Sequence, residues 1–592
     1  MLVYGDPKFE TPLDSLHRHL SARARQASAH PDDLDRLRAL LIACGQVEQG
    51  VHDAVEHARQ PGESEALARL FHQATAHAAA AFYSLAHKEL GLLPPPLVDA
   101  PRALGRLLQC LDSIDSLPDL VAAVKLPEGF NLHALYPEQY AVAAGQWLAD
   151  HDDKRTRGAV VVGIRSIGTT LAAVVASVLR AGGWQVQSFT VRPQGHPYAR
   201  TVGLEGMRFA SAALGLVVDE GPGISGSSMA ATAAALVKAG LAPESIAFLP
   251  GHANEPGGAG APEVQRWWQM APRYVADSTA LTFGGLELPQ ALAAAVGVQR
   301  ARIDNVSGGV WRQHVYPHPA DWPAICNQFE RVKYLCTAED GSRVLFKFYG
   351  LAASSPSLTS AAEAAAALLQ ERAARNLAPP VRGVAYGFVA TEWLEGTPLR
   401  SEAPPPDMAE TLGAYIARAA GPQLTASELA DANTRLADMI YVNTREACGE
   451  YAADRARQFG PPADAPPAAY GDGHMQPFEW ICCANGELRK VDGAGHASDH
   501  TLIGRQPVAW DLAGAVVEWQ LDPTATERLL QAFWLAGGAA IDAGTLKFYR
   551  AAYLAFRAGQ CALAAQMHDP YERERLLVAF GAYRQRLAEQ LG

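Results

Sequence analysis

The feature of this sequence that most restricts its fold is a regular alternation of two patterns between residues 158 and 250. Short runs rich in β-branched residues, such as AVVVGI, WQVQSFTV, LGLVVDE and SIAFLPG, alternate with alanine-rich stretches such as TTLAAVVASVLRAGG and MAATAAALVKAG. Strand-forming runs separated by helix-length segments are typical of βαβ units, in which helices connect parallel strands. Gly183 and Gly240 follow the alanine-rich stretches, where helices often end in a glycine. The sequence therefore predicts a parallel sheet in the middle of the chain.

The regions before and after this segment have different patterns of apolar residues. Before the sheet, apolar residues from Leu34 to Val55 recur at steps of three and four, which is typical of an amphipathic helix. After it, the runs FERVKYLCT and SRVLFKF flank Asp340-Gly341, a strong hairpin signal, and a mostly helical pattern follows. A chain of 592 residues is also too long for one hydrophobic core. We therefore expect an α/β multidomain protein with a helical region at 1–128, a parallel-sheet domain at 129–298 and a third domain at 299–592.

Composition excludes several classes of function. The formal net charge of −12 and the lack of a long basic run argue against nucleic acid as a partner. The first residues lack the apolar core of a secretory signal, and no apolar run has the length of a membrane span, so we expect a cytoplasmic protein without a membrane partner. Eight cysteines without CxxC spacing predict reduced thiols.

A candidate sugar-phosphate site lies within the predicted sheet domain. The strand LGLVV ends in Asp219 and Glu220, and a loop of small residues leads into a helix that begins near Met229. Carboxylates at a strand end can accept hydrogen bonds from ribose hydroxyls, while N–H groups and hydroxyls at a helix N-terminus can hold a phosphate. The loop residues expected on the phosphate are Ser225, Gly226, Ser227 and Ser228.

This segment resembles the phosphoribosyl-diphosphate motif of type I phosphoribosyltransferases, and VVVGIRSIGTTLAA resembles the family's first, pyrophosphate-contacting loop. The resemblance implies that Asp219 and Glu220 bind the ribose diol and that the serine loop binds the 5-phosphate of phosphoribosyl diphosphate or a related phosphorylated ribose. It also implies contacts from Ser166 and Gly168 and a catalytic role for Arg165 on the leaving group. The chain departs from the family because no residue among Gly221, Pro222 and Gly223 can act as a base.

A second candidate site is spread over the last half of the chain. Lys347 lies in a predicted strand and Glu363 in the following helix, the arrangement with which kinases position ATP phosphates. Farther on, Asp472 lies in the turn YGDGHMQP, and Asp492 ends the strand-like run ELRKV. One carboxylate can accept the proton of a substrate hydroxyl, and the other can hold Mg²⁺ on nucleotide phosphates.

These segments, with Trp510-Asp511-Leu512-Ala513, resemble the aminoglycoside phosphotransferase and choline kinase group. The resemblance implies a two-lobed α+β domain that uses ATP and Mg²⁺, with Asp472 as catalytic base, Asp492 as metal ligand and Lys347 with Glu363 as the phosphate-positioning pair. The family's metal-binding asparagine falls at Pro477, which leaves two alternatives: Gln476 or Glu479 replaces it as a ligand, or the site binds a single metal ion.

Two functions from different classes fit these motifs. The first is a bifunctional small-molecule transferase that phosphorylates a hydroxyl with ATP and binds or transfers a phosphoribosyl group. The alternative is a regulatory or scaffold protein whose degenerate pockets sense ATP and a phosphoribosyl ligand. Among smaller features, Trp267 and Trp268 are expected in the core, and His496 in a solvated loop.

Overall fold

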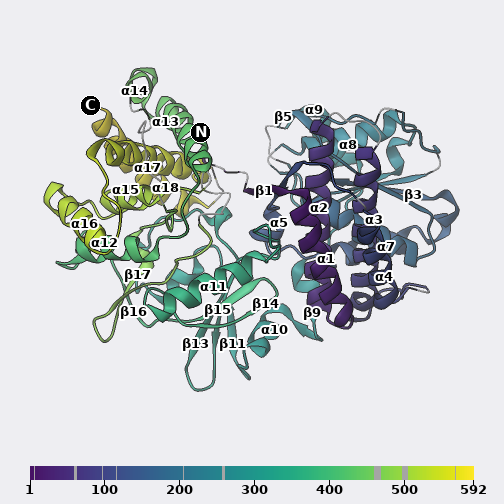
Figure 1. Cartoon of the computed structure of the whole chain (residues 1–592), viewed down its shortest axis with the longest axis horizontal. Coiled ribbons are helices and arrows are strands. Elements are labelled where there is room, and N and C mark those ends of the chain that lie inside the picture. The colour runs from purple at the N-terminus through teal and green to yellow at the C-terminus, as the bar shows by residue number, and fades with distance from the viewer. Residues whose placement is uncertain are drawn as a thin grey trace. The chain divides into compact units, whose positions relative to one another are not determined.

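The structure is a computed structural model that describes the chain except residues 4, 6, 59–62, 97, 115, 205, 212, 224, 257–259, 459, 461–468, 497–504 and 567–568. The chain forms two compact units, which are described separately (Figure 1). Unit 1 comprises Met1–Pro7, Val298–Tyr349 and Ala362–Gly592, and unit 2 comprises Lys8–Gly297 and Gly350–Ala361. The helical region expected before residue 129 and the expected sheet thus belong largely to one unit.

Unit 2 is built around a four-stranded parallel sheet with the strand order β4-β3-β7-β8. The strands and the two crossover helices are β3 (Ala159–Ile164), α7 (Ile167–Ala181), β4 (Val186–Val191), β7 (Leu214–Val218), α8 (Ser227–Lys238) and β8 (Ile246–Leu249). The strands β3, β7 and β8 are buried throughout, as expected of parallel strands that are covered on both faces, whereas the edge strand β4 is buried only at Val191. The predicted parallel sheet is confirmed.

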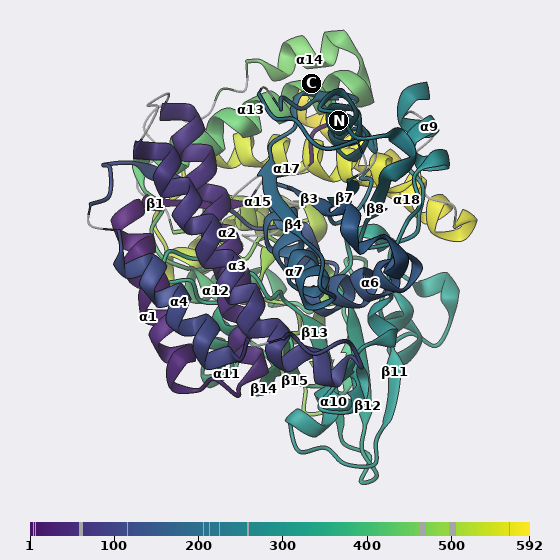
Figure 2. The ribbon, with the colours of Figure 1, turned by 90° about the vertical axis from the view of Figure 1, so that its right-hand side faces the viewer.

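The two faces of this sheet pack against different helices. Val161 and Leu216 face a core that also contains α7 and the N-terminal helices (Figure 2), whereas the cluster of Val162 and Val217 contains buried residues of α8 and α9. Side chains alternate across a strand, so each strand contributes to both cores. The helices of the first face are α1 (Leu13–Ala29), α2 (Leu34–Ala58), α3 (Glu63–Glu89), α4 (Ala100–Asp112) and α6 (Pro137–Asp150), and α9 is Pro262–Met270.

Shorter elements complete unit 2. They are β1 (Lys8–Pro12) paired with β2 (Val121–Lys125), α5 (Glu128–Asn131), β5 (Gln194–His196) paired with β6 (Ala199–Thr201), β9 (Thr282–Phe283) paired with β10 (Leu286–Glu287), and α10 (Leu288–Ala295). Trp268 is buried in the core, as expected. Throughout the described part of the chain, every helix is too short or too polar to cross a bilayer.

The smaller lobe of unit 1 is an antiparallel five-stranded sheet with the order β11-β12-β13-β15-β14. Its elements are β11 (Arg302–Asn305), β12 (Lys333–Thr337), β13 (Arg343–Phe348), α11 (Ala361–Ala374), β14 (Val381–Ala385) and β15 (Phe388–Glu392). The predicted hairpin forms between β12 and β13, where Gly341 has a φ of 83°. Helix α11 packs its apolar side on this sheet through Ala366 and Leu369.

The larger lobe of unit 1 is mostly helical. It contains β16 (Gly396–Pro398), α12 (Met408–Ala419), α13 (Ala426–Cys448), α14 (Glu450–Ala456), β17 (Trp480–Cys483), β18 (Leu488–Lys490), α15 (Val508–Glu518), α16 (Pro523–Leu535), α17 (Ala543–Ala564) and α18 (Pro570–Leu591). The first residues of the chain also belong here, because Met1 pairs with Glu446 and Val3 is buried among these helices. A β-rich lobe followed by a helical lobe is the two-lobed arrangement that the sequence predicts.

A long segment, residues 306–332, connects β11 to β12 and runs to the helical lobe. Its Arg312 is 3% exposed and donates to Glu572 in the first turn of α18, with an Nη2–Oε2 distance of 2.8 Å. The backbone N–H of Ile325 donates to the same carboxylate at 2.8 Å. A buried ion pair therefore holds this segment against α18.

Candidate functional site

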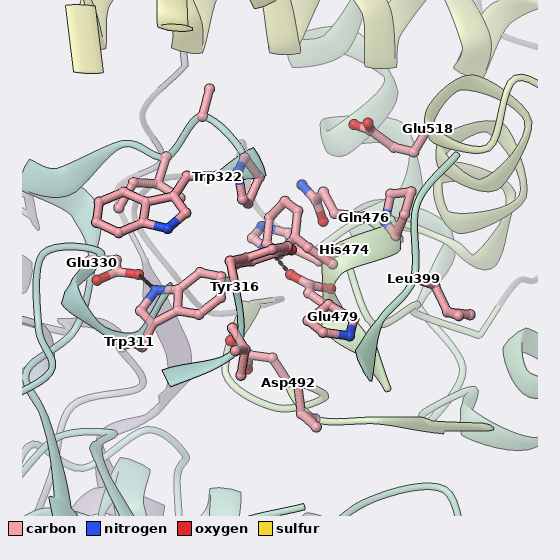
Figure 3. Close-up of a pocket in the computed structure, with 18 of the residues that line it drawn as sticks. Trp311, Tyr316, Trp322, Glu330, Leu399, His474, Gln476, Glu479, Asp492 and Glu518 are labelled. Atoms are coloured by element: carbon pink, nitrogen blue, oxygen red, sulfur yellow. Dashed lines mark hydrogen bonds and ion pairs between the residues drawn. The ribbon is translucent and has the colours of Figure 1, made fainter. Parts of the chain in front are cut away.

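A cavity of about 620 Å³ lies within unit 1 and contains several of the residues singled out from the sequence (Figure 3). Its lining includes Lys347 from β13, Trp393 from the connection between the lobes, and Gln476 and Asp492 from the helical lobe. The segment 306–332 contributes an aromatic part of the wall. This enclosure, with a few convergent polar groups, is typical of a small-molecule site.

The loop that carries Asp472 is held by Asp511 in α15. The Asp511 carboxylate accepts hydrogen bonds from the backbone N–H of Asp472 at 2.6 Å and of Gly473 at 2.8 Å. Gly471 is required beside it, because a Cβ there would lie 2.3 Å from Asp511 Oδ2. Burial and the nearby Asp472 raise the pKa of Asp511 to about 7. Asp511 thus positions the loop through hydrogen bonds to its backbone.

Asp472 lies in a dense polar cluster, with its side chain 1% exposed. Its Oδ2 accepts from Tyr415 Oη at 2.8 Å and pairs with Lys490 Nζ at 3.0 Å. Burial alone would raise the pKa of Asp472, but Lys490, His496 and Arg372 together hold it well below its ordinary value. The carboxylate is therefore ionised and its orientation is fixed.

The partner of Lys347 differs from the expected one. Lys347 Nζ lies 2.6 Å from both carboxylate oxygens of Asp492, whereas Glu363 is an exposed residue of α11. Burial would raise the pKa of Asp492, but the positive charges of Lys347 and His496 hold it well below its ordinary value. The structure thus joins two of the predicted residues, Lys347 and Asp492, and the pairing of Lys347 with Glu363 stays a prediction.

The expectation that His496 lies in a solvated loop is wrong. His496 is 7% exposed, and its ring nitrogens lie 3.2 Å from Asp472 Oδ1 and 3.5 Å from Asp492 Oδ1. Burial alone would lower its pKa, but Asp492 and Asp472 raise it to about 9. Sequence position gave no signal for this role, nor for those of Lys490 and Tyr415, because their contacts depend on how β18 and α12 pack.

Gln476 is the residue expected from the sequence to hold a metal ion, a role that stays a prediction. Gln476 is 3% exposed, lines the cavity and has a buried Oε1 without a hydrogen-bond partner among the described residues. Together with the Asp492 carboxylate it offers hard oxygen donors, which fit Mg²⁺. His474, Glu479 and His496 also lie close enough together to hold a metal ion.

The acid pair of unit 2 lies at the carboxyl end of β7. Glu220 Oε2 accepts from the backbone N–H of Gly129 at 2.7 Å, and Asp219 Oδ1 accepts from that of Glu220 at 2.9 Å. Burial raises the pKa of each carboxyl to about 7, and for Glu220 the charge of Asp219 adds to this effect. Two carboxyl groups with displaced pKa values at a sheet edge are typical of a functional site.

The serine loop leads from this acid pair into α8. Gly226 is the N-cap of α8 with a φ of 64°, Ser227 and Ser228 begin its first turn, and Ser225 Oγ lies 3.0 Å from Ser227 Oγ. A Cβ on Gly226 would lie 2.8 Å from Nε1 of Trp268, and that buried N–H has no partner among the described residues. A helix N-terminus with an adjacent unused donor is suited to an anion.

The first loop lies beside the second. Ser166 is the N-cap of α7, and Gly168 approaches β7 so closely that a Cβ would lie 2.5 Å from the carbonyl oxygen of Val218. The side chain of Arg165, however, is 5% exposed and pairs with Asp53 and Glu56 of α2. The expected leaving-group residue is therefore held by two carboxylates in this structure.

The raised pKa of Asp219 predicts a pH-dependent effect on stability. Because the folded state binds the Asp219 proton up to about pH 7 and the unfolded state loses it near pH 4, unit 2 loses stability as pH rises between these values. Asp219→Asn is expected to raise the free energy of unfolding by about 1–3 kcal/mol at pH 8 and by less at pH 5, measured by urea denaturation. An equal change in the free energy of unfolding at both pH values would contradict the raised pKa of Asp219 as its cause. Asp112→Asn, at an exposed position, is the control.

Comparison with known proteins gives structural similarities alone. No family model and no curated protein matches the sequence. A macrolide 2'-phosphotransferase from Brachybacterium faecium is 18% identical, with 49% of this chain and 96% of that chain covered and a TM-score of 0.31. The choline kinase of Streptococcus pneumoniae is 14% identical, with 43% and 89% covered and a TM-score of 0.29. A spectinomycin phosphotransferase in complex with ADP and spectinomycin is 12% identical, with 51% and 96% covered and a TM-score of 0.33. These solved proteins are phosphotransferase enzymes.

Proposed function

We propose that unit 1 is an ATP-dependent phosphotransferase that phosphorylates a hydroxyl group of a small molecule. The observation that carries the proposal is a chain of contacts of 2.6–3.5 Å that links Lys347, Asp492 and His496, which line one cavity, to Asp472 directly behind His496. Phosphoryl transfer needs little covalent chemistry from the protein, so positioning and charge stabilisation are the main requirements. A buried lysine and two fixed carboxylates supply both.

In this mechanism, the acceptor oxygen attacks the γ-phosphorus, the bond from that phosphorus to the bridging oxygen breaks, and ADP leaves. Asp472 orients the acceptor hydroxyl and takes its proton as the new O–P bond makes that proton acidic. Its low pKa suits orientation more than early proton abstraction. Lys347 binds the α- and β-phosphates, and His496 adds positive charge close to both carboxylates.

Asp492 and Gln476 would hold Mg²⁺. The ion, when bound, neutralises charge on the nucleotide phosphates. Asp511 does not touch the reactants but keeps the Asp472 backbone in place. We expect Glu363 to become the partner of Lys347 once nucleotide is bound, because Asp492 would then serve the metal.

Calorimetric titration of the full chain with ATP and Mg²⁺ tests the nucleotide site. Lys347→Met is expected to weaken ATP binding at least tenfold, because one buried charge that faces the phosphates is lost. Glu363→Gln should reduce turnover more than ATP affinity if Glu363 becomes the partner of Lys347. Unchanged ATP affinity in Lys347→Met would contradict the assignment, and Lys547→Met is a control that removes an exposed lysine of α17 outside the lining of this cavity.

For unit 2, we propose a site for a 5-phosphorylated ribose. The adjacency of the Asp219–Glu220 pair to the N-terminus of α8, with the unused indole N–H of Trp268, favours it. The diol would bind the acid pair, and the 5-phosphate would bind the Ser225–Ser228 loop. Whether this site transfers the ribosyl group or senses its ligand is tested separately, by following release of the anomeric substituent.

A further inference from the structure

The edge of the unit 2 sheet carries two arginines whose positive charges are already neutralised. Arg165 follows β3 and Arg192 follows β4, so both lie at the carboxyl ends of the strands on the side away from β8. Arg165 Nη1 donates to Asp53 Oδ1 at 3.0 Å, and its Nη2 pairs with Glu56. Arg192 Nε donates to Asp53 Oδ1 at 3.2 Å, and its Nη1 donates to the Arg165 carbonyl oxygen at 2.8 Å.

Asp53 is fixed in place by the helix that carries it. It lies on α2, which is buried in the core at Val51 and the turns before it. Gln49 Nε2 also donates to Asp53 at 2.6 Å, so several donors converge on this carboxylate. Burial would raise the pKa of Asp53, but Arg192 and Arg165 lower it, and it is ionised at neutral pH. Asp53 is therefore an ionised, fixed carboxylate that pairs with both Arg165 and Arg192.

The order of the strands determines which end of a bound phosphorylated ribose lies next to the two arginines. A ribose held by Asp219 and Glu220, with its 5-phosphate at α8, lies after β7. The neighbouring strand is β3, and its loop touches β7 through Gly168 and Val218. The anomeric end of the sugar, which is opposite its 5-phosphate, would thus face the Arg165 loop. Two arginines and two carboxylates there carry no net charge, so they offer a diphosphate little attraction.

We infer that unit 2 takes a 5-phosphorylated ribose whose anomeric substituent is not anionic, in preference to phosphoribosyl diphosphate. This inference rests on the 5-phosphoribose site proposed above and specifies its ligand class. Donors remain for the 5-phosphate, because Trp268 Nε1 lies against Gly226 and is unpartnered among the described residues. At the anomeric end, Asp53 and Glu56 pair with both terminal nitrogens of Arg165, and Asp53 also pairs with Arg192, so these donors are not free for a diphosphate; Nε of Arg165 alone is without a partner among the described residues.

Calorimetry on the full chain with ribose 5-phosphate and with phosphoribosyl diphosphate, each with and without Mg²⁺, tests this inference. We expect wild type to bind ribose 5-phosphate at least tenfold more tightly than the diphosphate. Asp53→Asn should strengthen diphosphate binding at least tenfold and leave ribose 5-phosphate binding within about twofold, because it exposes arginine charge. Glu56→Gln, at a more exposed position, should also strengthen diphosphate binding. It therefore provides the same test if Asp53→Asn fails to fold.

The controls separate this inference from the site on which it rests. Asp112→Asn removes an equal charge from an exposed ion pair of unit 2 and should change neither affinity. Asp219→Ala should abolish binding of both ligands. Tighter binding of the diphosphate by wild type, or an unchanged preference in both Asp53→Asn and Glu56→Gln, would overturn the inference while leaving the site intact. Failure of wild type to bind either ligand would overturn the site and the inference together.

Discussion

Replacing Asp472 by asparagine is expected to lower the rate of phosphoryl transfer by about 10³-fold while ATP still binds. An amide has no negative charge with which to orient the acceptor hydroxyl and cannot take its proton, and such groups typically contribute about 10²–10⁴-fold. The measurement is the rate of ADP formation at saturating ATP and acceptor, with ATP affinity determined in parallel by calorimetry.

The neighbours of Asp472 require a control for misfolding. Lys490 and Arg372 are buried beside it, so the loss of one carboxylate also leaves positive charge less compensated. Asp438→Asn changes an acid outside this cluster and controls for loss of charge alone. If Asp472→Asn retained more than a tenth of the wild-type rate, Asp472 would not be the catalytic base.

Replacing Glu572 by alanine is expected to destabilise unit 1 by about 3–5 kcal/mol. Glu572 is 1% exposed and is the carboxylate that Arg312 contacts through both terminal nitrogens, at 3.2 and 2.8 Å. Its loss leaves a buried guanidinium without its counter-charge and frees the N–H of Ile325. The change is measured by urea denaturation and by hydrogen exchange in the segment 306–332, which should exchange faster.

Two comparisons separate the buried pair from ordinary surface charge. Glu410→Ala breaks the exposed pair with Arg528 in the same unit and should cost less than about 1 kcal/mol. The double variant Arg312→Met with Glu572→Met should be more stable than Glu572→Ala alone, because no unpaired charge remains buried. A double variant that is less stable than Glu572→Ala would contradict an electrostatic origin for the loss.

The sequence predicts those parts of the fold that depend on local pattern. The alternation between residues 158 and 250 correctly predicts the parallel strands, and Asp340-Gly341 correctly predicts the hairpin between β12 and β13. The N-terminal helices were expected as a region of their own, yet they share a core with α7. An amphipathic pattern shows that a face is buried but not what covers it.

The candidate site was predictable only in part for the same reason. Motif spacing identified Lys347 and Asp492, which line one cavity, and Asp472, which is buried against His496 of the same cavity. The contacts of Arg165 with α2 and of His496 with both carboxylates join residues whose relation depends on tertiary packing. The position of a charged residue in a sequence does not show which residue of opposite charge it will contact. Thus the sequence identifies several residues of the candidate site but does not predict which of them contact one another.

The most direct test of the central claim is ³¹P NMR of the full chain incubated with ATP, Mg²⁺ and a panel of hydroxylated small molecules. The account predicts a phosphate monoester signal that grows together with ADP in the presence of an accepted compound and is absent with Asp472→Asn. Binding of ATP without formation of a monoester from any compound would contradict phosphotransfer and favour a regulatory or scaffold protein that senses ATP.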